Sequence, residues 1–163
     1  MNWGIEDLYW IRLVAFSGFL ILLTVAVIFD LRYRRIPNWV NLSLLAIWAA
    51  AAISASLLFD GVWKDFAYAG LVALIVLLVS IGMFFLRAIG GGDAKMLAAV
   101  ALWMPPGGVT SYLIAVILTG GLVSLVTLLW SKGNESRDKR VPYGVAIAFG
   151  GLWVCAQTFF SAK

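Results

Sequence analysis

Two aspartates, Asp30 and Asp93, are the side chains in this sequence best placed to do chemistry. Each stands at the end of a strongly apolar segment, where an ionisable group is expensive to keep and by default marks a functional site. Two carboxyls that meet share a proton, so that one activates a water molecule and the other polarises a carbonyl group. The pair therefore predicts an aspartyl protease within a membrane.

A run of three glycines, Gly90, Gly91 and Gly92, comes directly before Asp93. Glycine allows backbone angles and close approaches that a side chain would block. We expect this loop to give an extended substrate room beside the carboxylates.

The two aspartates are expected to differ in charge. Asp93 should begin a short helix, where the helix dipole favours a negative charge, whereas Asp30 should end the first helix, where the dipole has the opposite sign. We therefore expect Asp93 to be the ionised member of a pair that titrates as a unit.

Composition limits the classes of protein to which the chain can belong. Of its 163 residues, 63% are hydrophobic and only 12% are charged, too little polar surface for a soluble globule of this size. With no histidine and only Cys155, which we expect to pack in an apolar run, the chain lacks the residues for a zinc site, a Ser-His-Asp triad or an internal disulfide. We expect an all-α integral membrane protein that needs no metal or cofactor.

The elements that must position the aspartates are apolar runs close to the length that crosses a bilayer. Five such runs are Leu8–Phe29, Trp39–Phe59, Phe66–Leu86, Val109–Trp130 and Val141–Phe160. A sixth, Ala94–Met104, would reach only about 16 Å as a helix before a Pro-Pro-Gly-Gly sequence ends it. The sequence thus predicts one membrane domain over residues 1–163 with about six spanning helices, the fourth short and preceded by a glycine-rich loop.

Basic residues indicate the orientation of these helices. If all six cross, nine of the twelve lysines and arginines lie in loops on one side, and only Arg12, Lys64 and Lys163 lie on the other. Cytoplasmic loops carry such an excess. We therefore expect a multi-pass protein of the cytoplasmic (inner) membrane, with both termini outside and both aspartates at the cytoplasmic face. The basic residues lie between apolar runs, so nucleic-acid binding is not expected.

Each of these residues also has a structural interpretation. Asp93 could cap the short helix, and Asp30 could be an interfacial charge beside Arg32 or Arg34. The segments Pro37-Asn38 and Pro142-Tyr143-Gly144 read as helix starts, with proline near the first position and an asparagine able to cap. Lys95 either tunes the site or anchors its helix to lipid headgroups.

Three segments together resemble the type IV prepilin peptidases, relatives of the archaeal preflagellin peptidases. They are Asp30-Leu31-Arg32-Tyr33-Arg34-Arg35-Ile36-Pro37-Asn38, Gly90-Gly91-Gly92-Asp93-Ala94-Lys95, and Val141-Pro142-Tyr143-Gly144-Val145-Ala146-Ile147. The resemblance implies that the protein cleaves the basic leader peptide from prepilin or pseudopilin precursors at the cytoplasmic face. It also implies that Asp30 and Asp93 are the catalytic pair and that Gly90 and Gly92 belong to the signature. The further residues expected to bind substrate or to form part of the motif are Gly91, Lys95, Pro37, Asn38, Pro142, Tyr143 and Gly144.

The chain departs from the long bacterial members of this family, which carry a cysteine-rich insertion and an N-methyltransferase activity. We do not expect methylation, because the chain has one cysteine and no such insertion. It looks like the short form found with tight-adherence or Flp-type pilus systems. A homo-oligomer is compatible with the sequence.

Other functions remain open at this point. A presenilin-type protease shares the Gly-x-Gly-Asp motif but pairs it with Tyr-Asp, whereas Asp30 follows Phe29. A Ser-Lys protease using Lys95 would lack an obvious serine. A proton-coupled transporter could use both acids as carriers, although no carboxylate marks the other half of its path. A non-catalytic pilus-assembly scaffold is the remaining alternative.

Overall fold

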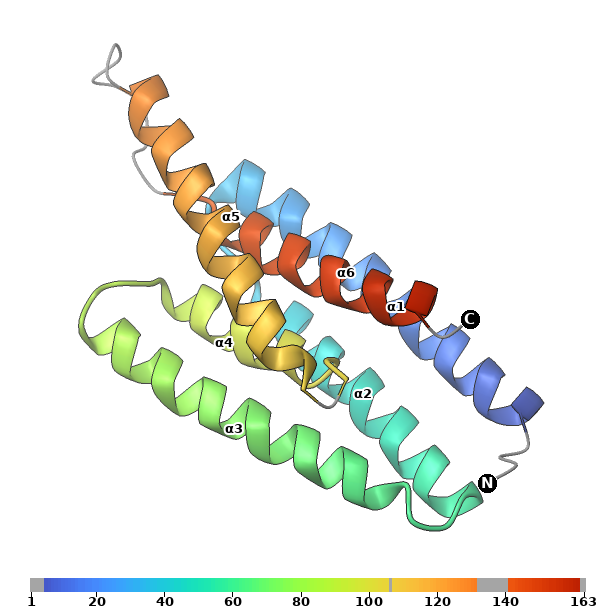
Figure 1. The fold of residues 1–163 in the computed structure, drawn as a ribbon. Helices are drawn as coiled ribbons and strands as arrows, with labels where there is room; N and C mark the ends of the chain where they lie inside the picture. Colours follow the sequence, from blue (N-terminus) through green and yellow to red (C-terminus); the bar gives the residue numbers. More distant parts are fainter. Residues whose placement is uncertain (1–4, 106, 132–140, 162–163) are drawn as a thin grey trace.

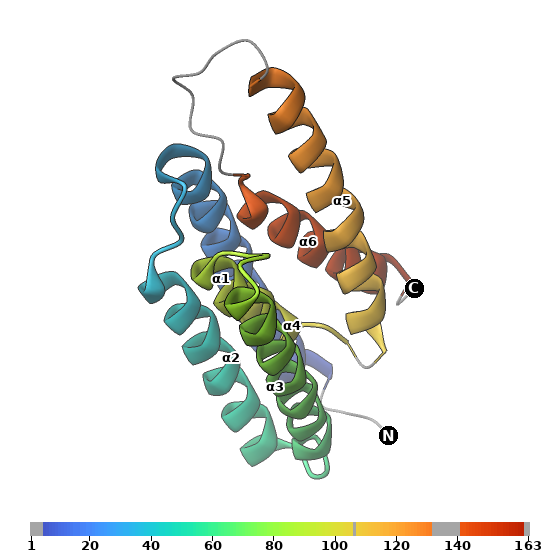
Figure 2. The ribbon, with the colours of Figure 1, turned by 90° about the vertical axis from the view of Figure 1, so that its left-hand side faces the viewer.

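The computed structural model describes residues 5–105, 107–131 and 141–161. These residues form six α-helices (Figures 1 and 2). The helices are α1 (Ile5–Tyr33), α2 (Asn38–Leu58), α3 (Trp63–Phe85), α4 (Gly91–Ala101), α5 (Gly108–Ser131) and α6 (Tyr143–Ser161). The prediction of an all-α membrane protein is confirmed.

Four of the described helices are long and apolar enough to cross a membrane. Their candidate spans are Leu13–Tyr33, Asn38–Leu58, Trp63–Phe85 and Gly108–Leu129. The apolar part of α6, Tyr143–Gln157, is shorter, and α4 has only 11 residues. Length and composition alone therefore identify four spans, and the expected total of about six rests on the topology proposed below.

Two helix ends differ from those expected from the sequence. The first helix does not end at Asp30 but continues for one turn to Tyr33. The short helix covers Gly91–Ala101 rather than Ala94–Met104, so two of the three glycines lie in its first turn. Pro105 disfavours helical angles in Met104, the residue before it, and the helix ends three residues before Met104.

The short helix α4 is enclosed by the longer ones. It packs against α2, α3 and α6, and Figures 1 and 2 show it in the middle of the bundle. Most of its residues are buried, and the majority of those are alanines that let neighbouring backbones approach closely. An 11-residue helix is thus covered by protein at its sides instead of spanning the lipid alone.

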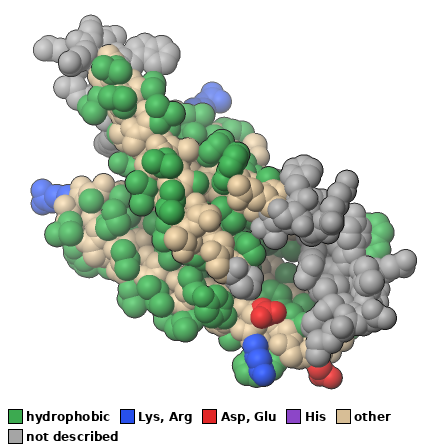
Figure 3. Space-filling model, in the orientation of Figure 1, with side chains coloured by type: hydrophobic (Ala, Val, Ile, Leu, Met, Phe, Trp, Pro, Cys, Tyr) green, Lys and Arg blue, Asp and Glu red, His purple; other side chains and the backbone are tan. Residues whose placement is uncertain are grey.

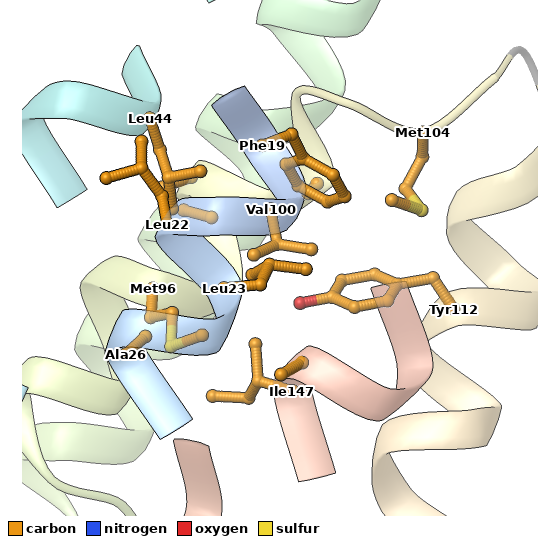
Figure 4. Packing of buried hydrophobic residues seen from close by; sticks show 14 of the residues in the cluster. Phe19, Leu22, Leu23, Ala26, Leu44, Met96, Val100, Met104, Tyr112 and Ile147 are labelled. Atoms are coloured by element: carbon orange, nitrogen blue, oxygen red, sulfur yellow. The ribbon is translucent and has the colours of Figure 1, made fainter. Parts of the chain in front are cut away.

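The core joins α4 to helices from both ends of the chain. Phe19 and Leu23 of α1, Val100 of α4 and Tyr112 of α5 are all buried (Figure 4). The Tyr112 hydroxyl donates a hydrogen bond to the Leu97 carbonyl at 3.2 Å, so this buried polar group has a partner. The core therefore fixes α4 between α1 and α5.

The outer surface is apolar over most of its height. Large hydrophobic side chains are exposed in the middle of the helices, such as Leu78 (61%) in α3 and Ile117 (70%) in α5. Figure 3 shows hydrophobic side chains across the visible face and charged side chains at its ends. Exposed apolar area this large indicates a surface in contact with lipid.

Close contact between α6 and the core gives a testable prediction. A Cβ atom on Gly151 would lie 2.7 Å from Val100 Cγ1, and buried Val100 has little room to move. We expect Gly151→Ala to destabilise the protein by about 1–3 kcal/mol, as overpacked cores do. The midpoint of thermal unfolding in detergent, followed by tryptophan fluorescence, would measure the change.

Gly121→Ala is the matched control. It also lies inside a helix, but a Cβ there would have no atom of the described residues within 4 Å apart from its own helix backbone and neighbours. Alanine in a helix interior should stabilise by roughly 0.5–1 kcal/mol. Equal midpoints for the two variants would contradict the packing described for α6.

Candidate active site

Asp30 lies in the last turn of α1 and points at the N-terminus of α6. Its side chain is only 4% exposed. The backbone N–H of Gly144, the second residue of α6, donates a hydrogen bond to Asp30 Oδ2 at 2.8 Å, and the N–H of Val145 interacts with the same carboxylate. Free N–H groups and the positive end of the dipole make a helix N-terminus a ready site for an anion.

The contact between α1 and α6 requires glycine at position 144. A Cβ there would lie 2.8 Å from Asp30 Oδ2 and 3.1 Å from both Asp30 Cβ and Cγ. Cβ atoms do not approach other heavy atoms so closely, so any larger residue must push the carboxylate away. Gly144, predicted only as a motif residue at a helix start, thus lies directly against Asp30.

Asp93 is the third residue of α4, and its carboxylate folds back over the start of that helix. The N–H of Gly90, the residue before α4, interacts with it, an arrangement like the reach of an N3 acid in a capping box. A Cβ on Gly90 would lie 2.7 Å from Asp93 Oδ2. Asp93 therefore also occupies a helix N-terminus, as predicted.

The glycines before Asp93 allow close contacts with neighbouring residues and do not adopt unusual backbone angles. Gly90 has ordinary extended angles, φ −73° and ψ 150°, and the described glycines with positive φ are Gly61 and Gly107. A Cβ on Gly92 would lie 3.5 Å from the Ile36 side chain and carbonyl oxygen. Of the two properties considered for these glycines, the structure shows close approach: Gly90 lies against the Asp93 side chain, Gly91 against Phe84 of α3, and Gly92 against Ile36 in the α1–α2 connection.

The two aspartates lie near each other. The negative charge of Asp30 acts on Asp93, and the positive charge of Arg34 acts on Asp30. Arg34 follows α1 with a left-handed backbone, φ 53°, and its N–H donates to the Asp30 carbonyl at 2.9 Å. Its Nη1 atom is buried without a hydrogen-bond partner among the described residues. Sequence reasoning had considered Arg34 only as a surface partner of Asp30.

The expected difference between the aspartates does not hold as argued. Asp30 is near the C-terminus of its own helix, but its carboxylate meets the N-terminus of α6. The helix-dipole argument therefore favours negative charge at both positions. It therefore gives no ground for naming Asp93 as the ionised member. The sequence analysis did not include the contact with α6, because its residues lie more than a hundred positions from Asp30.

Lys95 and Asn38 pair with each other on another face of α4. Lys95 Nζ donates to Asn38 Oδ1 at 3.0 Å. Residues two apart on a helix point about 200° away from each other, so Lys95 faces away from Asp93. Asn38 is the first residue of α2 and its side chain does not cap the helix. Neither residue joins the aspartates.

The prolines and Tyr143 have structural positions. Pro37 is the residue before α2 rather than its first residue, and it lines a shallow groove with Phe29 and Tyr33. Pro142 is buried just before α6. A Cβ on Gly120 of α5 would lie 3.2 Å from the Tyr143 ring, so this ring packs against α5 and not against the carboxylates.

The chemistry available here is that of two carboxyls, backbone N–H groups and one guanidinium. In the part of the chain that the structure describes, no three His, Cys, Asp or Glu side chains come together as metal ligands. Sequence reasoning missed Ile36, whose contact with Gly92 brings α4 to the end of α1. Its place in the segment that begins at Asp30 was the only signal.

Comparison with known proteins identifies the family. The comparisons with curated proteins and with solved structures gave no match. The sequence profile of the type IV leader peptidase family matches residues 17–125, about two thirds of the chain. This region contains both aspartates and ends before α6. The chain therefore belongs to the type IV leader peptidase family.

Proposed function

We propose that this protein is an aspartyl endopeptidase that removes the leader peptide from prepilin or pseudopilin precursors, of the Flp type, with Asp30 and Asp93 as its catalytic residues. Membership of the type IV leader peptidase family makes it a peptidase related to prepilin processing. The observation that carries the proposal further is the approach of two carboxyls, each at a helix N-terminus, within an apolar bundle.

Two carboxyls in this arrangement can hydrolyse a peptide bond without other groups. One carboxylate takes a proton from a water molecule, and the oxygen of that water attacks the scissile carbonyl carbon. The other carboxyl donates its proton to the carbonyl oxygen. Collapse of the tetrahedral intermediate breaks the C–N bond, and a proton passes to the leaving amine.

The fixed environment of the pair favours this chemistry. The N–H of Gly144 holds one Asp30 oxygen at 2.8 Å, and the N–H of Val145 interacts with the same carboxylate. Arg34 adds a positive charge beside Asp30. Preorganised groups of this kind stabilise charge in the transition state without having to reorganise.

The orientation we propose places this site at the cytoplasmic face. Arg32, Arg34 and Arg35 follow the same helix end as Asp30, and Arg87 and Lys95 lie on either side of the start of α4. Positive loops stay in the cytoplasm. With α4 and α6 crossing as well, the six helices place both termini outside. A basic leader followed by an apolar segment would then present its boundary at this end.

The two carboxyls give a prediction about activity. Asp30→Asn and Asp93→Asn should each lower the rate of prepilin cleavage by roughly 10²–10⁴-fold, the contribution typical of a general acid or base. The measurement is cleavage of an Flp-type prepilin by the purified protein in liposomes, followed by mass spectrometry of the products.

Asp65→Asn is the matched control, since Asp65 is exposed in the first turn of α3. It should cleave at the wild-type rate, and all variants should keep their thermal unfolding midpoint. Activity close to wild type in Asp30→Asn or Asp93→Asn would remove that residue from catalysis. Unchanged pilin processing in cells carrying either variant would favour a scaffold.

The contact of Gly144 with Asp30 gives another prediction about activity. Gly144→Ala should lower kcat by about 10²-fold, because an added Cβ displaces Asp30 and a misplacement of about 1 Å has effects of this size. KM should change less than kcat, because the added Cβ displaces a carboxyl that acts on the reacting bond in the proposed mechanism.

Steady-state kinetics of Gly144→Ala beside Gly121→Ala would measure the difference. Both replace a helical glycine, but Gly121 is an exposed residue of α5 without such a contact. Wild-type kcat in Gly144→Ala would show that Asp30 does not need the position that α6 gives it.

A further inference from the structure

Arg34 follows α1 in a backbone conformation that residues with a side chain rarely adopt. Its φ is 53°, in the left-handed region that favours glycine. Its N–H donates a hydrogen bond to the Asp30 carbonyl at 2.9 Å, which closes the last turn of α1. Glycine is the usual residue at such a helix end, so an arginine held in this conformation points to a function of its side chain.

The Arg34 side chain is drawn partly into the protein. Its Nη1 atom is buried without a hydrogen-bond partner among the described residues, and its positive charge acts on Asp30. Arg87 has a similar angle after α3, φ 58°, but its side chain is exposed. A buried cation is expensive unless an opposite charge lies nearby. Within the described chain, attraction to Asp30 is therefore the interaction that favours this position of Arg34.

The two carboxyls of the site have unequal surroundings. Two N–H groups from the first turn of α6 and the charge of Arg34 act on Asp30. One N–H group, that of Gly90, acts on Asp93, and the negative charge of Asp30 opposes a second one there. Asp30 is almost fully buried, which by itself favours a neutral carboxyl, so its partners decide its charge. They stabilise the anion on Asp30 more than Gly90 stabilises it on Asp93.

We propose that Arg34 is a positioning residue that keeps Asp30 ionised, so that the proton shared by the pair resides on Asp93. This inference deepens the proposed peptidase function and rests on it. Asp30 then takes a proton from water while the water oxygen bonds to the carbonyl carbon, and Asp93 gives its proton to the carbonyl oxygen. When the C–N bond breaks, Asp30 passes its proton to the amine and Asp93 regains one from the intermediate.

Among the described residues, Arg34 is the cation that acts on Asp30. The helices packed against α1 are α2 and α6, and neither α2 nor Tyr143–Ser161 of α6 contains a charged residue. The Tyr143 ring packs against α5, and Cys155 lies about 16 Å further along α6. Lys95 of α4 is bonded to α2. The other ionisable side chains around the end of α1 are exposed, namely Arg32, Tyr33 and Arg35.

The test is the pH dependence of prepilin cleavage by variants of Arg34. Arg34→Gln removes the positive charge, so protons compete more strongly with the ionised pair. We expect the acid limb of kcat/KM to move to higher pH by about 1 unit. Such a shift lowers the rate about ten-fold at the same acidic pH and much less at alkaline pH. Arg34→Lys restores the charge and should bring the limb back toward its wild-type position. The measurement uses purified protein and an Flp-type prepilin in detergent micelles.

Arg87→Gln is the matched control, because Arg87 is also an arginine with a left-handed backbone after a helix but is exposed. Its pH profile should coincide with that of the wild type. Arg34→Gly guards against a folding defect, since glycine suits a φ of 53°. It should unfold at a temperature at least as high as the wild type, while its acid limb moves as in Arg34→Gln.

Profiles of Arg34→Gln and Arg34→Gly that coincide with the wild type would overturn the inference. A uniform loss of activity at every pH that Arg34→Lys does not restore would also overturn it, because that result indicates a structural role. Both results leave the proposed function standing if the wild type cleaves the prepilin and Asp30→Asn does not. A wild type that cleaves no prepilin would overturn the proposed function itself.

Discussion

The hydrogen bond from the Gly144 N–H to Asp30 is the contact on which the arrangement of this site depends. A carboxylate buried among apolar helices is expensive unless it has partners, and the N-terminus of α6 supplies them. The bond joins helices whose residues are 114 positions apart. The closeness of this contact explains why glycine stands there, since a Cβ at position 144 would lie 2.8 Å from Asp30 Oδ2.

The short helix α4 supplies the second carboxylate under a different constraint. Eleven residues cannot cover the thickness of a bilayer, and the surrounding helices take the place of lipid at its sides. Its buried residues are mostly alanines, and the glycines at its start contact Phe84 and Ile36. These close contacts between α4 and its neighbours fix the position of Asp93 within the bundle. Asp93 and Lys95 lie on different faces of α4: Asp93 lies near Asp30, and Lys95 donates a hydrogen bond to Asn38 of α2.

The sequence predicted the composition of the fold and of the site better than the contacts within it. Apolar runs gave six helices with errors of a few residues at their ends, and the two aspartates with the glycine run identified the candidate pair. The partner of Asp30 could not be predicted, because it depends on how α6 packs beside α1. For the same reason, the pairing of Lys95 with Asn38 appeared only in three dimensions. Helix periodicity shows which residues share a face but not which helix that face meets.

The order of synthesis gives the contact between α6 and Asp30 a consequence in time. Domains of a growing chain are made from the N-terminal side, so α1 to α5 leave the ribosome before Gly144 does. Both carboxylates are therefore present in the nascent chain while the N–H group that positions Asp30 does not yet exist. A peptidase that depends on this N–H group therefore has no assembled site until α6 has entered the bundle.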